Sequence, residues 1–129
     1  MTAEKIALIV EDSAEMAETL VIALMGVPQI ETHVVATGPD AVAFLEGLNG
    51  SAVCAVLTDL NMPGMDGYEL ILAIRSAAST TRIPILVISG ETDPAAGPKA
   101  LSLGANAFFP KPYSSGAVRR KLEELLNAA

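Results

Sequence analysis

Five short apolar runs alternate with segments in which apolar residues recur at helical spacing, and this alternation constrains the fold more than any other feature of the sequence. A strand that is buried on both faces appears as a continuous apolar run, and strands that alternate with helices form a parallel sheet with helices on both faces. We therefore predict an α/β fold, a doubly wound parallel sheet. The runs expected to form its strands are residues 6–10, 32–35, 53–57, 85–88 and 107–109.

The order of the strands follows from which of them suit an edge of the sheet. The second run mixes polar with apolar residues, and the fifth is followed directly by Pro110, which cannot donate a hydrogen bond to a neighbouring strand. Both features are typical of edge strands. The order 2-1-3-4-5 places both strands at edges and leaves the first and third adjacent, at the switch point where ligands bind in such sheets.

Local signals mark the starts of several helices. Ser13 can cap the first helix, Asp66 and Glu69 form a capping-box pattern before the third, and Ser114 or Ser115 can cap the last. The Ser and Asp side chains can accept a hydrogen bond from an unpaired backbone N–H in the first turn, and Glu69 can reach back to the N–H of the cap residue. We therefore expect helices to begin directly after these residues.

The fourth helix has an unusual start, because Gly97-Pro98 lie within the segment 95–103 that should form it. Proline inside a helix costs about 3 kcal/mol unless it lies in the first turn. We expect this helix to be short or to begin near Pro98. The second helix is expected to end at Asn49-Gly50, a pair that breaks helices.

The composition fits one domain with a substantial core, since 51% of the 129 residues are hydrophobic. The formal net charge of −7 argues against direct nucleic-acid binding, which needs a basic surface. The sequence has no signal-peptide pattern and no apolar run long enough to cross a membrane. Its single cysteine, Cys54, forms no internal disulfide. We therefore expect a cytoplasmic protein that does not insert into a membrane.

Polar residues follow four of the five predicted strands. Glu11 and Asp12 come after the first strand, Asp59 after the third, Ser89 after the fourth and Lys111 after the fifth. The carboxyl ends of parallel strands lie at one rim of the sheet, so these side chains should lie near one another. A helix cap or a turn could explain any one of them. Together they indicate a binding site.

The charges of this group point to a metal and a phosphoryl group. Three carboxylates at one rim repel one another, and a divalent cation relieves the repulsion. All candidate ligands are oxygens, which suits Mg²⁺, with Mn²⁺ as the alternative. Asp59 is the candidate nucleophile, because carboxylates form aspartyl-phosphate intermediates. Lys111 could stabilise charge on the transferring oxygens, and Ser89 could hydrogen-bond the attached phosphoryl group.

Four segments at these strand ends match the pattern of a known family. They are Ala7-Leu8-Ile9-Val10-Glu11-Asp12-Ser13, Leu57-Thr58-Asp59-Leu60-Asn61-Met62-Pro63-Gly64-Met65-Asp66-Gly67, Val87-Ile88-Ser89-Gly90 and Phe108-Phe109-Pro110-Lys111-Pro112. Over essentially its whole length the chain resembles the response regulator receiver domain, the CheY-like phosphoacceptor module of two-component signal transduction. The resemblance implies the flavodoxin-like (CheY-like) fold in a single domain over residues 1–129, without an output domain. It also implies a phosphorelay switch rather than an enzyme that turns over a substrate.

The resemblance assigns roles to the residues around the phosphoacceptor. It implies that Asp59 accepts a phosphoryl group from a sensor histidine kinase or a histidine phosphotransfer protein. It implies Mg²⁺ held by Asp12, Asp59 and the backbone carbonyl of Asn61, with Glu11 acting through a water molecule. The domain would catalyse its own phosphorylation in this Mg²⁺-dependent step.

The resemblance also implies a conformational switch. Ser89 would turn inward to bond the phosphoryl group, Lys111 would pair with that group, and Phe108 would fill the vacated space. The surface of the fourth helix, fifth strand and fifth helix would then change. Many members of the family carry Tyr where this chain has Phe108, so the hydroxyl group is absent here. The Lys111-Pro112 peptide bond is expected to be cis.

Two polar residues occupy positions that tune dephosphorylation in the family, Asn61 and Glu91. Each could orient an attacking water molecule, so slow autodephosphorylation is expected. Gly97-Pro98 put the family's usual output or dimer face in doubt. We expect a monomer or weak dimer whose downstream target the sequence does not name.

Three alternative functions can be compared with this one. A turnover phosphatase with this chemistry generally has a second Asp two positions after the nucleophile, where this chain has Asn61. A flavodoxin-like carrier of FMN would need a phosphate-binding loop after the first strand, where Glu11-Asp12 would repel phosphate. The remaining alternative is a receiver-like protein-interaction module that signals without phosphorylation.

Overall fold

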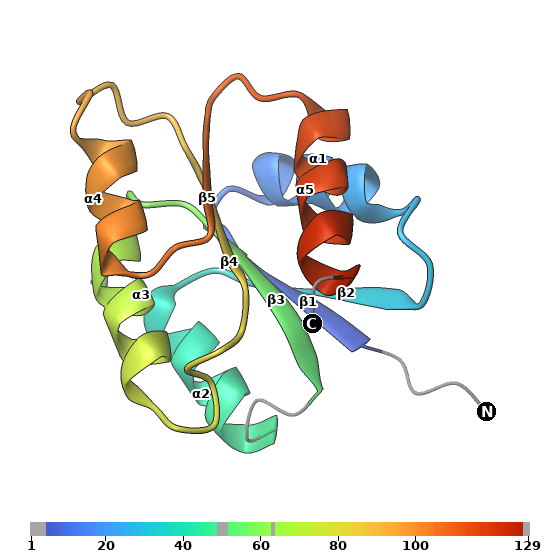
Figure 1. The fold of residues 1–129 in the computed structure, drawn as a ribbon, viewed down its shortest axis with the longest axis horizontal. Helices are drawn as coiled ribbons and strands as arrows, with labels where there is room; N and C mark the ends of the chain where they lie inside the picture. Colours follow the sequence, from blue (N-terminus) through green and yellow to red (C-terminus); the bar gives the residue numbers. More distant parts are fainter. Residues whose placement is uncertain (1–4, 49–51, 63, 128–129) are drawn as a thin grey trace.

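The computed structural model describes residues 5–48, 52–62 and 64–127. Within these residues, strands and helices alternate strictly along the chain (Figure 1). The strands are β1 (Lys5–Val10), β2 (Ile30–Val35), β3 (Val53–Thr58), β4 (Ile85–Ser89) and β5 (Ala107–Pro110). The helices are α1 (Ala14–Leu24), α2 (Gly38–Leu48), α3 (Gly67–Ser76), α4 (Ala96–Leu103) and α5 (Ser115–Asn127).

All strands run parallel in the order β2-β1-β3-β4-β5, so the predicted α/β class and strand order are confirmed. The edge strand β2 begins at Ile30, earlier than predicted, because Ile30 still pairs with Lys5 of β1. At the centre, Val10 of β1 lies opposite Thr58 of β3. This register places the residues that follow β1 and β3 side by side at one rim.

The core has two layers, one on each face of the sheet. Figure 1 shows α1 and α5 on one side of the sheet and α2, α3 and α4 on the other. Successive strand residues point to opposite faces, so Leu8 and Val10 pack in one apolar cluster while Ala7 and Ile9 pack in the other. All four residues are inaccessible to solvent. Burial on both faces is the reason that the central strands appear as continuous apolar runs.

The predicted helix caps are confirmed at three helices. Ser13 caps α1, and Asp66 and Glu69 form the complete capping box of α3. At α5 the cap is Ser114, whose Oγ accepts a hydrogen bond from the backbone N–H of Ala117. The next residue, the alternative cap, is already part of the helix. The expected end of α2 at Asn49-Gly50 lies outside the described residues.

Helix α4 is short, as predicted, and contains both helix-breaking residues in its first turn. Pro98 lies where its missing N–H has no helical partner to lose. The N-cap residue is Ala95, which offers no side-chain hydrogen bond to the helix. The helix therefore begins without a cap of its own. Among the described residues, no helix combines the length and the apolar character needed to cross a membrane.

Candidate functional site

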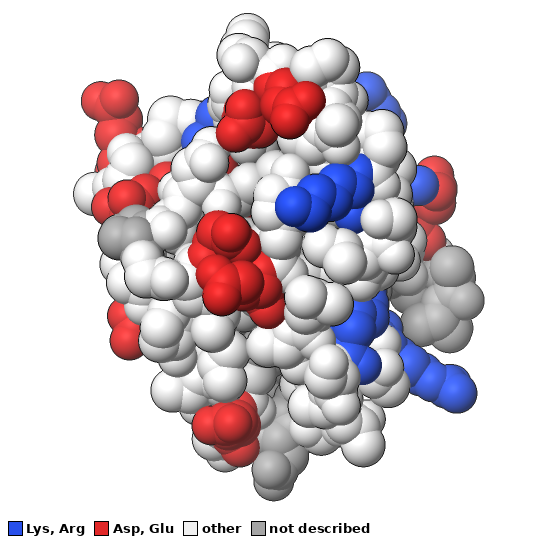
Figure 2. All heavy atoms as spheres, turned by 90° about the vertical axis from the view of Figure 1, so that its left-hand side faces the viewer, with Lys and Arg blue, Asp and Glu red and all other residues white. Residues whose placement is uncertain are grey.

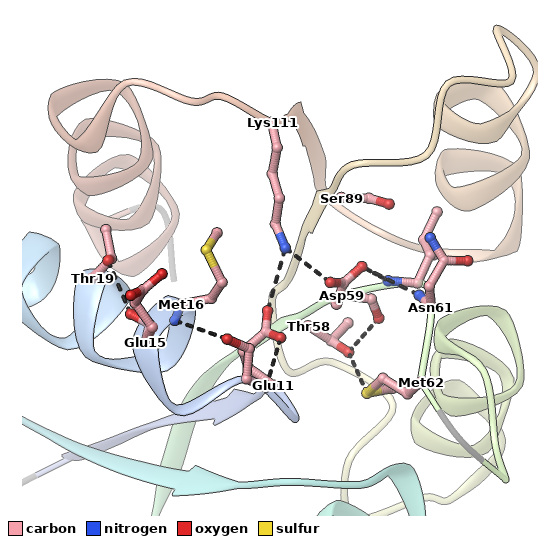
Figure 3. A network of polar contacts seen from close by, with 12 residues as sticks. Glu11, Glu15, Met16, Thr19, Thr58, Asp59, Asn61, Met62, Ser89 and Lys111 are labelled. Atoms are coloured by element: carbon pink, nitrogen blue, oxygen red, sulfur yellow. Dashed lines mark hydrogen bonds and ion pairs between the residues drawn. The ribbon is translucent and has the colours of Figure 1, made fainter.

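Three of the predicted site residues lie together at the carboxyl ends of the central strands and β5. Lys111 Nζ is 2.9 Å from Asp59 Oδ2 and 3.4 Å from Glu11 Oε1. Figure 3 shows the Lys111 side chain reaching between the two carboxylates. One ammonium group therefore bridges carboxylates that follow two adjacent strands.

The two carboxylate oxygens of Asp59 have different environments. Oδ1 accepts hydrogen bonds from the backbone N–H groups of Leu60 at 2.6 Å and Asn61 at 3.2 Å. Oδ2 faces Lys111 instead. Only 10% of the side chain is exposed, so its orientation is fixed by the surrounding loop. The loop after β3 thus anchors one oxygen and directs the other to the centre of the site.

Glu11 is more deeply buried than Asp59, with 4% of its side chain exposed. Oε2 accepts a hydrogen bond from the backbone N–H of Ser13 at 3.2 Å. Burial raises the pKa of the Glu11 carboxyl, because the charged form loses its hydration, and the charge of Asp59 acts in the same direction. The Ser13 hydrogen bond and the Lys111 charge oppose this rise. The carboxyl therefore depends on nearby positive charge to remain ionised.

Lys111 supplies part of that positive charge. Burial lowers the pKa of its ammonium group, but the hydrogen bond to Asp59 and the charges of Asp59 and Glu11 outweigh burial. The pKa of Lys111 is therefore raised above its usual value. The side chain stays protonated at neutral pH and remains available to bind an anion.

The donor groups at this rim fit a small, hard cation. Asp12 is exposed directly beside buried Glu11, and Asn61 follows Asp59 in the loop after β3. Glu11, Asp12 and Asp59 carry three negative charges when ionised, and Lys111 balances one of them. Oxygen ligands with uncompensated negative charge suit Mg²⁺, which keeps several waters and needs few protein ligands. The described residues contain no cluster of three acidic, His or Cys side chains arranged around one metal position. The fit therefore depends on the carboxylates of Asp12 and Asp59 and on the backbone carbonyl of Asn61, the ligands that the family resemblance implies.

Ser89 lies at the end of β4 and is fully buried. Its Oγ accepts a hydrogen bond from the backbone N–H of Glu91 at 3.0 Å. Figure 3 shows Ser89 near Asp59, with no hydrogen bond drawn between them. Glu91 in turn uses Oε1 to accept the backbone N–H of Asp93 at 3.1 Å. In this conformation both predicted residues are engaged in the loop that follows β4.

The predicted switch residue, Phe108, is partly buried on the side of the sheet that carries α4. A Cβ atom added to Gly97 would lie 3.3 Å from Phe108 Cδ1, so the ring packs against the first turn of α4. The Lys111-Pro112 peptide bond is cis, as predicted.

The close packing of Gly67 against the loop after β3 was not predicted from the sequence. A Cβ atom at this position would lie 2.7 Å from Leu60 Cα, far inside van der Waals contact. The Gly67 N–H also donates to the Leu60 carbonyl at 2.8 Å. The Asp66-Gly67 pair at the start of a predicted helix was a usable signal for this close approach. Glycine here lets α3 begin directly against the residue that follows Asp59.

A second missed residue is Thr58, which is almost completely buried at the end of β3. Its Oγ1 donates a hydrogen bond to the Asp59 carbonyl at 2.8 Å and lies 4.0 Å from Met62 Sδ. Figure 3 shows these contacts below the Asp59 carboxylate. A threonine at the end of an apolar run is typical of any strand, so nothing in the sequence predicted this contact.

Charged side chains elsewhere are more dispersed. Figure 2 views the face that carries α3 and α4, where acidic and basic side chains form separate groups with uncharged surface between them. Lys99 lies over the ring of Tyr68, with Nζ 4.1 Å from the ring centre, and joins α4 to α3. The Lys99 ammonium group is therefore paired with an aromatic ring.

Comparison with known proteins adds a family to this geometry. The model of the response regulator receiver domain matches residues 7–123. The transcriptional regulatory protein FixJ of Bradyrhizobium diazoefficiens is 36% identical over 90 residues, which cover 70% of this chain and 43% of FixJ. This chain thus spans less than half of that relative.

Two solved structures extend the likeness to nearly the whole chain. A putative response regulator from Chloroflexus aurantiacus has a TM-score of 0.86 at 27% identity, covering 96% of this chain and 98% of that one. The signal receiver domain of a signal transduction histidine kinase from Syntrophus aciditrophicus has a TM-score of 0.85 at 30% identity, covering 97% and 92%.

The chain belongs to the response regulator receiver domain family. The CheY-like fold that the sequence predicted is confirmed by the strand order and by these structures. The domain is thus a signalling switch of the two-component response regulator class.

Proposed function

We propose that this domain accepts a phosphoryl group on Asp59 from a sensor histidine kinase or a histidine phosphotransfer protein, in a Mg²⁺-dependent step. The observation that carries the proposal is the asymmetry of the Asp59 carboxylate. Backbone N–H groups hold Oδ1, whereas Oδ2 faces the Lys111 ammonium at 2.9 Å. A carboxylate held in this way presents one defined oxygen as a nucleophile.

In the proposed transfer, Asp59 Oδ2 forms a bond to phosphorus as the P–N bond of the donor phosphohistidine breaks. The imidazole leaves with the electron pair of that bond. Lys111 would move from the Asp59 carboxylate to the phosphoryl oxygens and stabilise their charge. When bound, Mg²⁺ would supply further charge stabilisation, and Asp12, Asp59 and the Asn61 carbonyl would hold it, with Glu11 acting through water.

After transfer, the buried Ser89 hydroxyl would donate a hydrogen bond to the phosphoryl group. Phe108 would then move into the space that opens beside it, and the surface of α4, β5 and α5 would change. Asn61 and Glu91 would orient the water that slowly hydrolyses the acyl phosphate. The downstream target would bind to this changed surface.

Intact-mass spectrometry after incubation with acetyl phosphate and Mg²⁺ tests the proposal. The wild type should gain one phosphoryl group, and Asp59→Ala or added EDTA should abolish the gain. Asp40→Ala, which removes an exposed carboxylate at the start of α2, should behave as the wild type.

The result that would overturn the proposal is a wild-type protein that binds Mg²⁺ but gains no phosphoryl group from acetyl phosphate or from a phosphohistidine donor. That result would favour the interaction module that works without phosphorylation.

A further inference from the structure

A series of side-chain hydrogen bonds connects Ser89 with the first turn of α4. Ser89 Oγ accepts the N–H of Glu91 at 3.0 Å, and Glu91 Oε1 accepts the N–H of Asp93 at 3.1 Å. Asp93 Oδ1 accepts the N–H of Ala95 at 2.9 Å, and the Asp93 carbonyl accepts the N–H of Ala96 at 3.0 Å. Each acceptor side chain thus holds the backbone two residues further along. We call this series the loop ladder.

The loop ladder is important for α4 because the start of this helix has little other support. Its N-cap residue, Ala95, makes no side-chain cap hydrogen bond, and Gly97 and Pro98 occupy the first turn. Asp93 therefore contributes the side chain that binds an N–H group where the helix begins. Loss of an N-terminal cap raises the equilibrium constant for opening of a helix by roughly fivefold or more.

The other end of α4 is held independently of the ladder. Gly104 donates its N–H to the carbonyls of Ala100 and Leu101. Its own carbonyl accepts a hydrogen bond from Arg75 Nε of α3 at 2.9 Å. A change in the loop after β4 would therefore act on the first turn of α4, while the last turn stays attached to α3.

The first turn of α4 is also the surface against which Phe108 packs. Ala96 is 2% exposed, and the backbone of Gly97 lies against the Phe108 ring. A shift of this turn would change the space available to the ring. The hydrogen-bonding state of Ser89 and the position of Phe108 are thus joined through one short segment.

We propose that Asp93 is a positioning residue that transmits the hydrogen-bonding state of Ser89 to the first turn of α4. The inference rests on the proposed function, in which a phosphoryl group on Asp59 draws the Ser89 hydroxyl away from the Glu91 N–H. The Glu91 backbone then loses its anchor at β4, and the ladder moves as a unit. Asp93 carries that movement to the N–H of Ala95.

Amide hydrogen exchange on the unphosphorylated protein tests this coupling through a double-mutant cycle. Ser89→Ala and Asp93→Ala should each speed exchange at residues 95–100 by about fivefold, the change that corresponds to one net hydrogen bond. The double variant should exchange no faster than the faster single variant, because both substitutions break the same ladder. Asp93→Asn, which keeps the Oδ1 acceptor, should restore slow exchange.

A matched control removes a helix cap that lies outside the ladder. Thr37 Oγ1 accepts the N–H of Asp40 at the start of α2, after the edge strand β2. Thr37→Ala should speed exchange in α2, and its effect should add to that of Ser89→Ala. Additive effects of Ser89→Ala and Asp93→Ala at residues 95–100, or no effect of Ser89→Ala there, would overturn the proposal.

A second arm separates this inference from the phosphoacceptor proposal. With Mg²⁺ and acetyl phosphate, Asp93→Ala should gain a phosphoryl group as the wild type does, yet exchange in α4 should not change further. An equal response of α4 in both proteins would overturn the role of Asp93. Absence of phosphoryl uptake in the wild type would contradict the proposed function, and the cycle on the unphosphorylated protein would still decide the coupling.

Discussion

The side chain of Lys111 lies at the centre of the site, between the carboxylates of Glu11 and Asp59. Its ammonium group compensates two carboxylates, with one partner on each side. Lysine and not arginine suits this position if the group must leave one carboxylate and follow an arriving phosphoryl group, because an ammonium is a compact point charge on a flexible stem. The same residue therefore serves the resting and the phosphorylated states in our proposal.

Replacement of Lys111 should impair phosphoryl transfer more than folding. We expect Lys111→Gln to slow phosphoryl uptake at least about 100-fold, since the loss of one preorganised charge stabiliser typically costs that much. A time course of intact mass with acetyl phosphate would measure the rate. Lys121→Gln is the matched control, because Lys121 forms an exposed ion pair with Glu124 at 2.9 Å. Equal rates in the two variants would contradict the role of Lys111.

The buried Glu11 carboxyl should make stability depend on pH. Its pKa is raised in the folded protein above the usual value of 4.5, so the folded state favours the protonated form. The stability gained by protonation is complete below pH 4.5 and is lost as the pH rises through the folded pKa. Without Mg²⁺, Glu11→Gln should therefore be more stable than the wild type at neutral pH.

The advantage of Glu11→Gln should shrink as the pH falls toward 4.5, where the wild-type carboxyl becomes protonated. Urea denaturation in the presence of EDTA, at several pH values, would measure the difference in the free energy of unfolding. Glu124→Gln, at an exposed position, should show no such trend. A constant difference between Glu11→Gln and the wild type across this range would contradict the interpretation.

At the scale of elements, the contact between α3 and the loop after β3 determines the position of the Asp59 side chain. The helix begins at Gly67, whose N–H bonds the Leu60 carbonyl and whose Cα has no room for a side chain. Asp66 and Glu69 fix the start of the helix through the capping box. The loop that carries Asp59 is therefore packed closely between β3 and the first residue of α3.

Two glycine substitutions should have opposite effects on stability. Gly67→Ala should destabilise the protein by about 1–3 kcal/mol, because overpacking against backbone forces a rearrangement. Gly47→Ala should stabilise it by up to about 1 kcal/mol, since Gly47 lies in α2 and, among the described residues, an added Cβ would meet no atom within 4 Å beyond its neighbours in the helix. Urea denaturation measures both. If Gly67→Ala had no effect, the close approach of α3 to Leu60 would be incorrect.

At the scale of the whole molecule, one partly buried guanidinium links segments that lie far apart in the sequence. Arg75, near the end of α3, donates hydrogen bonds to the carbonyls of Gly104, Thr81 and Ile83 and to Asn106 Oδ1. The Asn106 side chain also accepts the backbone N–H of Ile85. These contacts join α3 to the end of α4 and to the start of β4. They lie at the amino end of β4, whereas Asp59 lies at the carboxyl ends of the strands.

Loss of Arg75 should weaken the whole fold. We expect Arg75→Met to lower the free energy of unfolding by about 3 kcal/mol, because the partly buried carbonyls of Gly104 and Ile83 would lose their charged donor. Arg75→Lys should recover less than half of this loss, because one ammonium group cannot reach all the acceptors that the planar guanidinium of Arg75 contacts. Arg82→Met, at an exposed position in the following loop, is the control. Similar urea midpoints for Arg75→Met and Arg82→Met would contradict this role.

The elements and their order could be predicted from the sequence alone. Apolar runs, edge-strand signals and N-cap residues act over a few neighbours, so they can be read directly, and they predicted the sheet order, the caps at Ser13 and Asp66, and the short α4. The strand ends also indicated that Glu11, Asp59 and Lys111 share a rim, because parallel strands bring their carboxyl ends to one side.

Which atoms face one another at that rim became known only from the folded structure. It assigned Asp59 Oδ1 to the loop and Oδ2 to Lys111, turned Ser89 toward Glu91, and placed Phe108 against the backbone of Gly97. These contacts depend on the register of the sheet and on how closely each helix approaches it. The packing of the whole chain sets both quantities, and no local pattern of residues encodes them.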